Sequence, residues 1–186
     1  SAMSQQQLDA ITEAVAKAFS AAAPELAEMA VAETGFGNVS DKTVKNRFAS
    51  RHVLNAIKDM KTVGVLNRNP EEKLWEIGVP MGVIAAIVPS TNPTSTVCYK
   101  ALIALKSGNS IVFSPHPKAI ACTRRAAEIV AQAAQQAGAP AGSVGCLRIP
   151  SMAGCQELMS AEPVRLILAT GGPAMVKAAY SSGKPA

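Results

Sequence analysis

The sequence has 186 residues, of which 48% are apolar and 17% charged, with 18 Lys and Arg against 13 Asp and Glu and a net charge of +5. This composition supports a sizeable folded core and excludes an intrinsically disordered chain. The basic residues are spread thinly, without a run or an aromatic-interleaved stripe, which argues against a nucleic-acid-binding protein.

The cysteines and the distribution of charge indicate the redox environment and the cellular location of the protein. Four cysteines, at positions 98, 122, 146 and 155, form no CxxC pair and have no histidine at ligand spacing, which predicts inert reduced thiols and no metal site. Residues 77–99 carry no charge, but prolines and a Ser, Thr and Asn cluster interrupt them, so no membrane span is expected. No signal peptide is recognisable, and the opening Ser-Ala-Met is typical of an expression remnant. We expect a cytoplasmic protein.

The N-terminal third is predicted to be helical. Residues 5–33 form an Ala-rich helical pattern that is interrupted at Pro24 and ends at the glycines of "ETGFG". A second helix is expected from Asp41, a suitable N-cap, to Lys61. Its apolar face is predicted to comprise Val44, Phe48, Leu54 and Ile57.

Residues 62–79 read as two strands around a polar turn from Asn67 to Lys73. An extended hairpin of this kind projects from the main body and offers strand edges with which another subunit can pair. We therefore treat it as a candidate oligomerisation element.

From Gly82 the pattern alternates regularly between strands and helices. Strands are predicted at 82–88, 110–114, 144–149 and 164–169, and helices at 93–106, 118–137, 151–160 and from near Gly172 almost to the end. Four successive strand–helix units with short connections predict a parallel sheet with helices on both faces. Ligands bind beyond the carboxyl ends of such strands. The loops there are Pro89–Thr94, Ser114–Lys118, Pro150–Ala153 and Thr170–Pro173.

The first of these loops, "PSTNP", has two interpretations. Asn92 can be an N-cap with Pro93 as the first helical residue. Alternatively, its side-chain amide can point into the crevice and stabilise an oxyanion that develops on a substrate carbonyl. The sequence leaves both interpretations open.

The other loops are less specific. The glycines of "LATGGPAMV" can serve a tight turn, or they can let a phosphate approach backbone N–H groups at a helix N-terminus. Neither GxGxxG nor GxxxxGK[ST] occurs, so a bound dinucleotide is not held in the usual Rossmann way. His116, between two prolines, is more typical of loop packing than of a general base, and His52 has no evident partner. The residues alone thus predict a ligand-binding parallel α/β domain with one candidate carbonyl-directed amide.

Four motifs in register resemble one family. "MAVAETGFGNVSDKTVKN", "GVIAAIVPSTNPTST", "ALKSGNSIVFSPHP" and "LILATGGPAMVKAAYSSGKPA" are similar to the CoA-acylating aldehyde dehydrogenases, which include part of the bifunctional aldehyde–alcohol dehydrogenases and microcompartment enzymes. The resemblance implies an aldehyde-dehydrogenase-type Rossmann-like fold, with N-terminal helices of the cofactor-binding domain at 1–61, the hairpin at 62–80 and an NAD-binding domain at 81–186. It also implies oxidation of an aldehyde by NAD⁺ through a cysteine thioester that is passed to CoA.

The resemblance also assigns site residues. Along the nicotinamide half of the cofactor it places the loop formed by Ile87, Val88, Pro89, Ser90, Thr91 and Asn92, with the Asn92 amide in the oxyanion hole. It places Ser114 and His116 near the adenosine half, and Thr170, Gly171 and Gly172 at a close backbone approach to the dinucleotide. The serine followed by Pro-His-Pro is similar to the acylating branch, whereas general aldehyde dehydrogenases have a lysine there. This difference favours acylation over hydrolysis.

The resemblance places the nucleophilic cysteine after "SSGKPA", beyond Ala186, so we expect this chain alone to be inactive. The expected partners are a small aldehyde, CoA and further copies of the full-length enzyme. NADP stays open, because no acidic ribose-binding residue or arginine clamp can be assigned, and the microcompartment lumen stays open as a location. The alternatives are a stand-alone nucleotide-binding or assembly module and a non-acylating aldehyde dehydrogenase.

Overall fold

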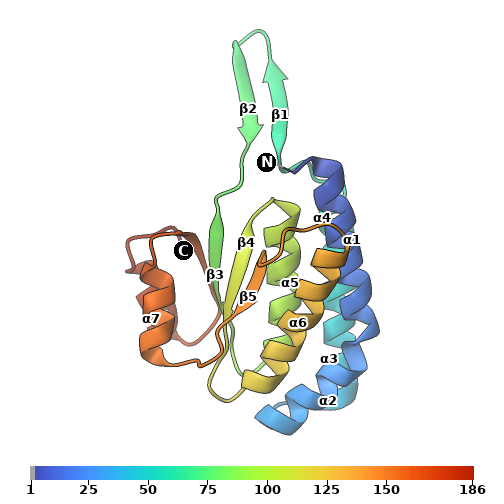
Figure 1. The fold of residues 1–186 in the computed structure, drawn as a ribbon, viewed down its shortest axis with the longest axis vertical. Coiled ribbons are helices and arrows are strands. Elements are labelled where there is room, and N and C mark those ends of the chain that lie inside the picture. Colours follow the sequence, from blue (N-terminus) through green and yellow to red (C-terminus); the bar gives the residue numbers. More distant parts are fainter. Residues whose placement is uncertain (1–2) are drawn as a thin grey trace.

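A computed structural model describes residues 3–186. A four-stranded parallel sheet lies between two groups of helices, and a two-stranded hairpin projects beyond them (Figure 1). The predicted fold class, a Rossmann-like parallel sheet preceded by N-terminal helices and a β-hairpin, is confirmed.

The N-terminal region is helical, as expected. Its elements are α1 Gln5–Ala21, α2 Ala23–Thr34, α3 Val39–Arg47, the π-helical η1 Phe48–His52 and α4 Val53–Ile57. A capping box begins α1: the Ser4 hydroxyl accepts from the Gln7 N–H, and the Gln7 side chain accepts from the Ser4 N–H. Pro24 lies in the first turn of α2, which explains the interruption seen in the sequence. Gly35 ends α2 in the left-handed region, with φ +69°.

The helix predicted from Asp41 to Lys61 begins and ends earlier than expected. Asn38 is the N-cap, because its backbone is extended and its side chain accepts from the Asp41 N–H at 2.9 Å. Asp41 instead lies in the first turn, where a carboxylate is favoured by the helix dipole. The helical run ends at Ile57, before the chain enters the hairpin.

The predicted inner face of that helix was also wrong in its first half. Val44 and Phe48 are 63% and 58% exposed, whereas Lys42, Asn46 and Ser50 are buried. We call these three buried residues the inner polar stripe; their spacing of four residues places them on one side of α3 and η1. Such burial is tolerated because each polar group has a hydrogen-bond partner.

The hairpin consists of β1 Gly64–Asn69 and β2 Leu74–Gly78, which pair antiparallel. The turn is shorter than expected, because Asn67 and Asn69 remain paired in β1. Both strands project away from the helices (Figure 1). Their exposed large apolar residues are Leu66, Leu74, Trp75 and Ile77.

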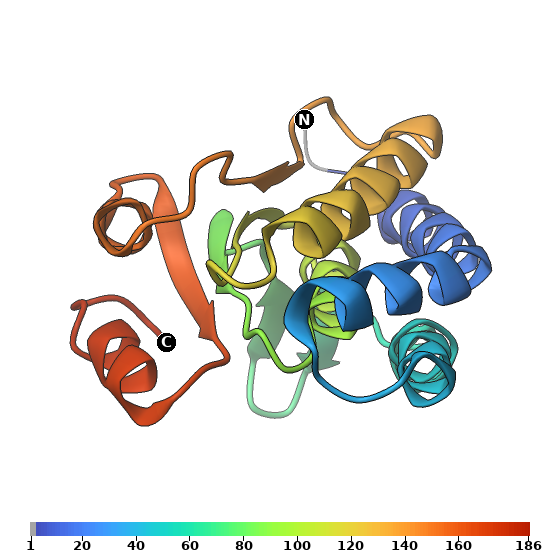
Figure 2. The same ribbon diagram turned by 90° about the horizontal axis from the view of Figure 1, so that it is seen from below.

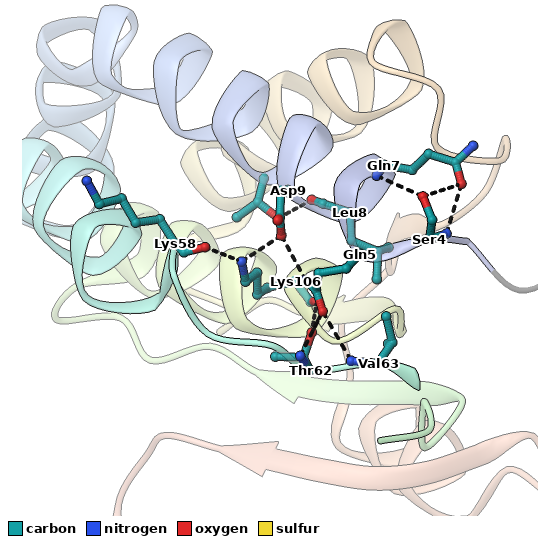
Figure 3. A network of polar contacts seen from close by, with 10 residues as sticks. Ser4, Gln5, Gln7, Leu8, Asp9, Lys58, Thr62, Val63 and Lys106 are labelled. Carbon is teal, nitrogen blue, oxygen red and sulfur yellow. Dashed lines mark hydrogen bonds and ion pairs between the residues drawn. The ribbon is translucent and has the colours of Figure 1, made fainter. Parts of the chain in front are cut away.

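A polar network fixes the root of the hairpin (Figure 3). The Gln5 side-chain oxygen accepts from the Thr62 N–H at 2.7 Å, and the Thr62 hydroxyl donates to the Lys106 carbonyl at 2.6 Å. The Lys106 amine lies 2.6 Å from Asp9, and Gln5 donates to the same carboxylate at 2.8 Å. Burial opposes ionisation of Asp9, but these hydrogen bonds outweigh it and hold the pKa of Asp9 below its usual value. The network ties the start of the hairpin to α1 and to the helix that ends at Lys106.

The central sheet has the order β5-β4-β3-β6 with all strands parallel. The strands are β3 Val83–Ile87, β4 Ser110–Ser114, β5 Val144–Cys146 and β6 Val164–Ala169. The helices that follow them are α5 Pro93–Lys106, α6 Ile120–Gln136, α7 Met152–Ser160 and α8 Pro173–Tyr180. All four predicted strand–helix units are confirmed.

The strand β5 is three residues shorter than predicted. It lies at the sheet edge and pairs only with β4. The Leu147 N–H still bonds to the Phe113 carbonyl at 2.9 Å, but β4 ends at Ser114, and the following Pro115 has no N–H to continue the ladder.

Helices cover both faces of the sheet, and Figure 2 shows the two layers. One layer contains α5 and α6 with the N-terminal helices, and the other contains α7 and α8. The larger core is made by the first layer against the sheet and includes Phe19, Leu102, Phe113 and Val130. A smaller core lies under α7 and α8 and includes Met159 and Ile167.

Candidate functional site

The carboxyl ends of β3, β4 and β6 border a crevice. From β3 the chain proceeds to β4 and β5 on one side, and β6 then returns to the other side of β3. Connections that diverge in this way leave a gap at the carboxyl ends of the strands, where ligands bind in open α/β sheets. A cavity of about 430 Å³ occupies this position.

Eight residues singled out in the sequence line the crevice, although they come from three separate loops. They are Ile87, Val88, Pro89, Ser114, His116, Thr170, Gly171 and Gly172. The first three end or follow β3, the next two end or follow β4, and the last three follow β6. The fold therefore brings together loops that are more than 80 positions apart.

Thr91 and Asn92 do not line the crevice; they line an adjoining cavity of about 390 Å³. Its wall also includes Phe48 from η1 and Tyr99 from α5. Pro89 and Thr170 belong to the walls of both cavities, so the two spaces meet there. Ser90 lines neither cavity and is half-buried.

Asn92 immediately precedes α5, with Pro93 as the first helical residue. Its side chain makes no capping hydrogen bond. Instead its backbone carbonyl accepts from the Thr96 N–H at 3.2 Å and from the Thr96 hydroxyl at 2.7 Å. The backbone thus begins the helix while the side-chain amide stays available on the wall of the adjoining cavity.

Lys100 joins the carboxyl ends of β3 and β6 from behind the site. This residue is 2% exposed, and its amine donates to the Ile87 carbonyl at 2.8 Å and to the Leu168 carbonyl at 2.6 Å. Burial disfavours the ammonium form and lowers the pKa of Lys100 to about 7. The neighbouring Tyr99 hydroxyl lies 3.2 Å from the Thr170 hydroxyl. The helix α5 therefore holds the two strand ends that border the crevice.

The loop between β3 and α5 has a second attachment, to the inner polar stripe. The Lys42 amine donates to the Thr91 carbonyl at 2.8 Å. Burial, with a smaller contribution from Lys45, lowers the pKa of Lys42 from its usual value. Asn46 accepts from the Thr94 hydroxyl at 2.8 Å and donates to the Ala23 carbonyl at 3.1 Å.

His116 is oriented by its own loop. Its Nδ1 accepts from the Lys118 N–H at 3.0 Å, so a neutral ring carries its proton on Nε2. Ser114 is buried at the end of β4, where its carbonyl accepts from the Val88 N–H at 3.1 Å. The two residues thus lie on a loop that is tied to β3.

Gly172 precedes α8 with an extended backbone, φ −69° and ψ 168°. A Cβ at this position would have no heavy atom of the protein within 4 Å. Gly172 lines the crevice and the space beside it is open, whereas a Cβ at Gly171 would press against Met175 at 3.3 Å. The chain can therefore approach a ligand closely at Gly172 without strain.

The cysteines have the properties of structural thiols. Burial raises the pKa of Cys98 strongly, raises that of Cys122 to about 12 and raises that of Cys146 to about 11. A thiol with a raised pKa is a poor nucleophile at neutral pH. Cys98, next to the site loop, is buried and suits a packing role.

Sequence reasoning missed several residues of the site. Ser151 and Met152, after β5, and Cys155, within α7, also line the crevice. Ser151, the N-cap of α7, and Met152, its first residue, fall within the stretch 150–153 that the strand–helix pattern already marked as following a strand. Lys42 and Lys100 carried a weaker signal: Lys100 is a single cation in an otherwise uncharged stretch of helix.

Residues 3–186 offer neither a membrane-spanning helix nor a cluster of metal-ligating side chains. None of the described helices combines the length and apolar character that a bilayer span requires. Within the same residues, His, Cys, Asp and Glu side chains do not gather in groups of three that would hold a metal ion.

The chain belongs to the aldehyde dehydrogenase family, whose sequence profile matches residues 1–185. It is 53% identical over 182 residues to the bifunctional aldehyde-alcohol dehydrogenase AdhE of Escherichia coli K12, covering 98% of this chain and 20% of that protein. An acetylating aldehyde dehydrogenase from Geobacillus thermoglucosidasius has a TM-score of 0.97 and 57% identity, over 98% of this chain and 40% of the other. The resemblance inferred from the motifs is confirmed.

Two more distant structures contain ligands. A propionaldehyde dehydrogenase from Rhodopseudomonas palustris, with bound CoA and an acylated cysteine, has a TM-score of 0.82 and 32% identity, over 98% of this chain and 42% of the other. An engineered glycolyl-CoA reductase with bound NADP⁺ has a TM-score of 0.81 and 32% identity, over 98% and 41%. This chain thus spans about a fifth of the length of AdhE and about two-fifths of these solved chains.

Proposed function

We propose that this chain is the N-terminal, cofactor-binding part of a CoA-acylating aldehyde dehydrogenase. The full-length enzyme converts an aldehyde, CoA and NAD⁺ into acyl-CoA, NADH and a proton. The observation that carries the proposal is the crevice, where eight residues from three loops meet at the strand ends. The similarity to an acetylating aldehyde dehydrogenase at 57% identity supports acyl transfer to CoA.

The proposed division of the chain follows its elements. Residues 1–61 supply the N-terminal helices of the cofactor-binding domain, and residues 62–80 form the hairpin. Residues 81–186 supply the Rossmann-like sheet and its crevice. The nucleophilic cysteine comes from the remainder of the enzyme, so this chain alone does not turn over.

The residues at the crevice fit a nicotinamide dinucleotide. The open space beside Gly172 admits a flat or extended ligand against the backbone, and Ile87, Val88 and Pro89 offer an apolar surface. Ile87, Val88 and Pro89 would hold the nicotinamide half and Ser114 and His116 the adenosine half, with Thr91 and Asn92 beside them in the adjoining cavity. The bound nicotinamide would supply the acceptor for a hydride from the substrate carbon. NAD is our primary assignment and NADP the alternative, since a relative was solved with NADP⁺.

Asn92 contributes to the chemistry from the adjoining cavity. Its amide donates a hydrogen bond to the aldehyde oxygen while a cysteine thiolate forms a C–S bond to the carbonyl carbon. The π electrons move to that oxygen, and the fixed N–H stabilises the resulting negative charge. Departure of hydride from the same carbon restores the carbonyl as a thioester. The CoA thiol then replaces the enzyme thiol and leaves as acyl-CoA.

Assembly and location are inferred from the exposed parts of the chain. The hairpin carries apolar side chains on a free two-stranded ribbon, which is marginally stable without further packing. It therefore packs against another copy in a homo-oligomer. The location is cytoplasmic, with the lumen of a bacterial microcompartment as the alternative.

The test is NADH production by the full-length enzyme from acetaldehyde and NAD⁺, with and without CoA. We expect sustained turnover only when CoA is present, with acetyl-CoA as the product, and none from the 186-residue chain. Equal turnover without CoA would identify a hydrolytic enzyme instead. No NADH from any short aldehyde would contradict the dehydrogenase, and turnover by the 186-residue chain would contradict its role as an inactive part.

A further inference from the structure

We propose that Lys42 and Asn46 are positioning residues: from α3 they brace the loop 89–94 and thereby set the place of the Asn92 amide. The inference rests on the proposed function, because it concerns the oxyanion donor of that reaction. It assigns a role to Lys42 and Asn46 of the inner polar stripe, whose side chains line neither cavity.

The stripe is buried where an apolar helix face was expected. Lys42 is 7% exposed and Asn46 is 1% exposed. Burial of a lysine amine and an amide is unfavourable unless hydrogen bonds compensate for it. Among residues 3–186 the Lys42 amine has no carboxylate at ion-pair distance. The hydrogen bond to the Thr91 carbonyl compensates for the burial of the amine. The buried cation therefore favours the loop conformation in which this contact forms.

The two contacts lie on either side of Asn92. Lys42 holds the carbonyl of the residue before it, and Asn46 holds the hydroxyl of Thr94, two residues after it. Asn46 is itself fixed by its bond to the Ala23 carbonyl of α2. The Asn92 backbone is therefore attached on both sides to α3, which is itself bonded to α2, while the Asn92 side chain stays free for a substrate.

The Lys42 contact also acts on the peptide group that it touches. The Thr91 carbonyl and the Asn92 N–H belong to one peptide unit, and a cation at the oxygen polarises that unit. The contact thus fixes the peptide group from which the Asn92 side chain extends. Loss of Lys42 frees one end of the loop, and a displacement near 1 Å can reduce turnover by roughly 10²-fold.

The experiment is a double-mutant cycle in the full-length enzyme between Lys42→Met and Asn92→Ala. We expect Lys42→Met alone to lower kcat by about 10- to 100-fold. The Kd of NADH should change by less than about twofold, because Thr91 lies outside the crevice. In the Asn92→Ala background Lys42→Met should cost little more, since it acts through Asn92. Arg47→Met, which removes an exposed cation from the same helix, is the matched control and should leave kcat unchanged.

Each outcome has one meaning. Inactive wild-type enzyme would contradict the proposed function and not the brace specifically. If the wild type is active and Lys42→Met keeps its kcat, the brace is wrong. A Lys42→Met loss of equal size with and without Asn92 would also overturn it, because Lys42 would then act elsewhere.

Thr94→Val provides a second route if Lys42→Met fails to fold. It removes only the hydroxyl that reaches Asn46 and keeps a similar shape at a buried position. We expect a smaller fall in kcat, several-fold, again suppressed in the Asn92→Ala background and without change in NADH affinity. A full-sized effect of Thr94→Val in that background would contradict the proposal.

Discussion

At the residue scale, a substitution at Gly172 tests cofactor binding without disturbing the fold. Its backbone angles are accessible to any residue, and an added Cβ meets no protein atom within 4 Å. Gly172→Val should therefore fold normally and place two methyl groups beside the crevice. We expect the Kd of NADH to rise at least about tenfold, or about 1.4 kcal/mol, measured by fluorescence titration alongside thermal unfolding. An unchanged Kd would remove Gly172 from the cofactor site.

A substitution at Asn92 tests the reaction step rather than cofactor binding. Because its side chain makes no capping bond, Asn92→Ala should cost little stability and leave cofactor affinity unchanged. Loss of one oxyanion donor should lower kcat by roughly 10²–10³, measured in steady state with saturating aldehyde, CoA and NAD⁺. Unchanged turnover would leave Asn92 with only the role of beginning the helix.

The lowered pKa of the buried Lys100 amine predicts that the stability of the fold depends on pH. Its pKa is about 7 in the folded protein and near 10.5 when unfolded, so between these values the unfolded chain binds more protons. Stability contributed by this position should therefore rise with pH above about 7. The difference in unfolding free energy between wild type and Lys100→Met should rise from pH 7 to 9, at up to about 1.4 kcal/mol per pH unit. Urea unfolding measures it, and a difference that is constant with pH would contradict the lowered pKa.

The residues that escaped sequence reasoning act over long sequence separations. Lys42 and Thr91 are 49 positions apart, and Lys100 and Leu168 are 68 apart. No local pattern encodes such pairs. Loop residues such as Gly172 and Asn92 could be predicted from the sequence, because the ends of strands in parallel sheets mark candidate sites whatever the packing. The separation of Asn92 from the crevice itself depended on tertiary packing and required the structure.

At the scale of elements, the hairpin exposes four large apolar side chains, Leu66, Leu74, Trp75 and Ile77. Trp75 is 56% exposed and lies opposite Arg68, whose guanidinium is 4.1 Å from the ring centroid. Trp75→Glu in the full-length enzyme should weaken self-association and shift sedimentation toward smaller species, because it places a charge in an apolar contact. Glu76→Ala, on the other face of the strand, is the matched control. An unchanged distribution for Trp75→Glu would exclude this face of the hairpin as an interface.

Elements with strong periodic signals and firm ends were predicted well. The bounds of α5, β4 and β6 agree with the sequence prediction, since Pro93 fixes the start of α5 and apolar runs define the strands. The bounds of α3 and β5 did not agree. The Asn38 cap and the polar inner face of α3 depend on partners in other elements, and β5 is limited by the end of the strand beside it.

At the scale of the whole molecule, the fold positions one crevice and one adjoining cavity that share Pro89 and Thr170. The N-terminal helices hold the loop between them, and α5 holds the strand ends. A dinucleotide in the crevice and an aldehyde in the adjoining cavity would meet at the shared wall. This arrangement is the physical basis for assigning cofactor binding and the oxyanion donor to one chain.

Backbone hydrogen exchange of the full-length enzyme, with and without saturating NADH, tests directly whether the crevice binds the dinucleotide. We expect slower exchange at the three strand ends, in peptides covering residues 86–92, 113–118 and 168–175, and little change in the hairpin. Protection confined to other segments, or none at saturation, would contradict the assignment of the crevice as the dinucleotide site.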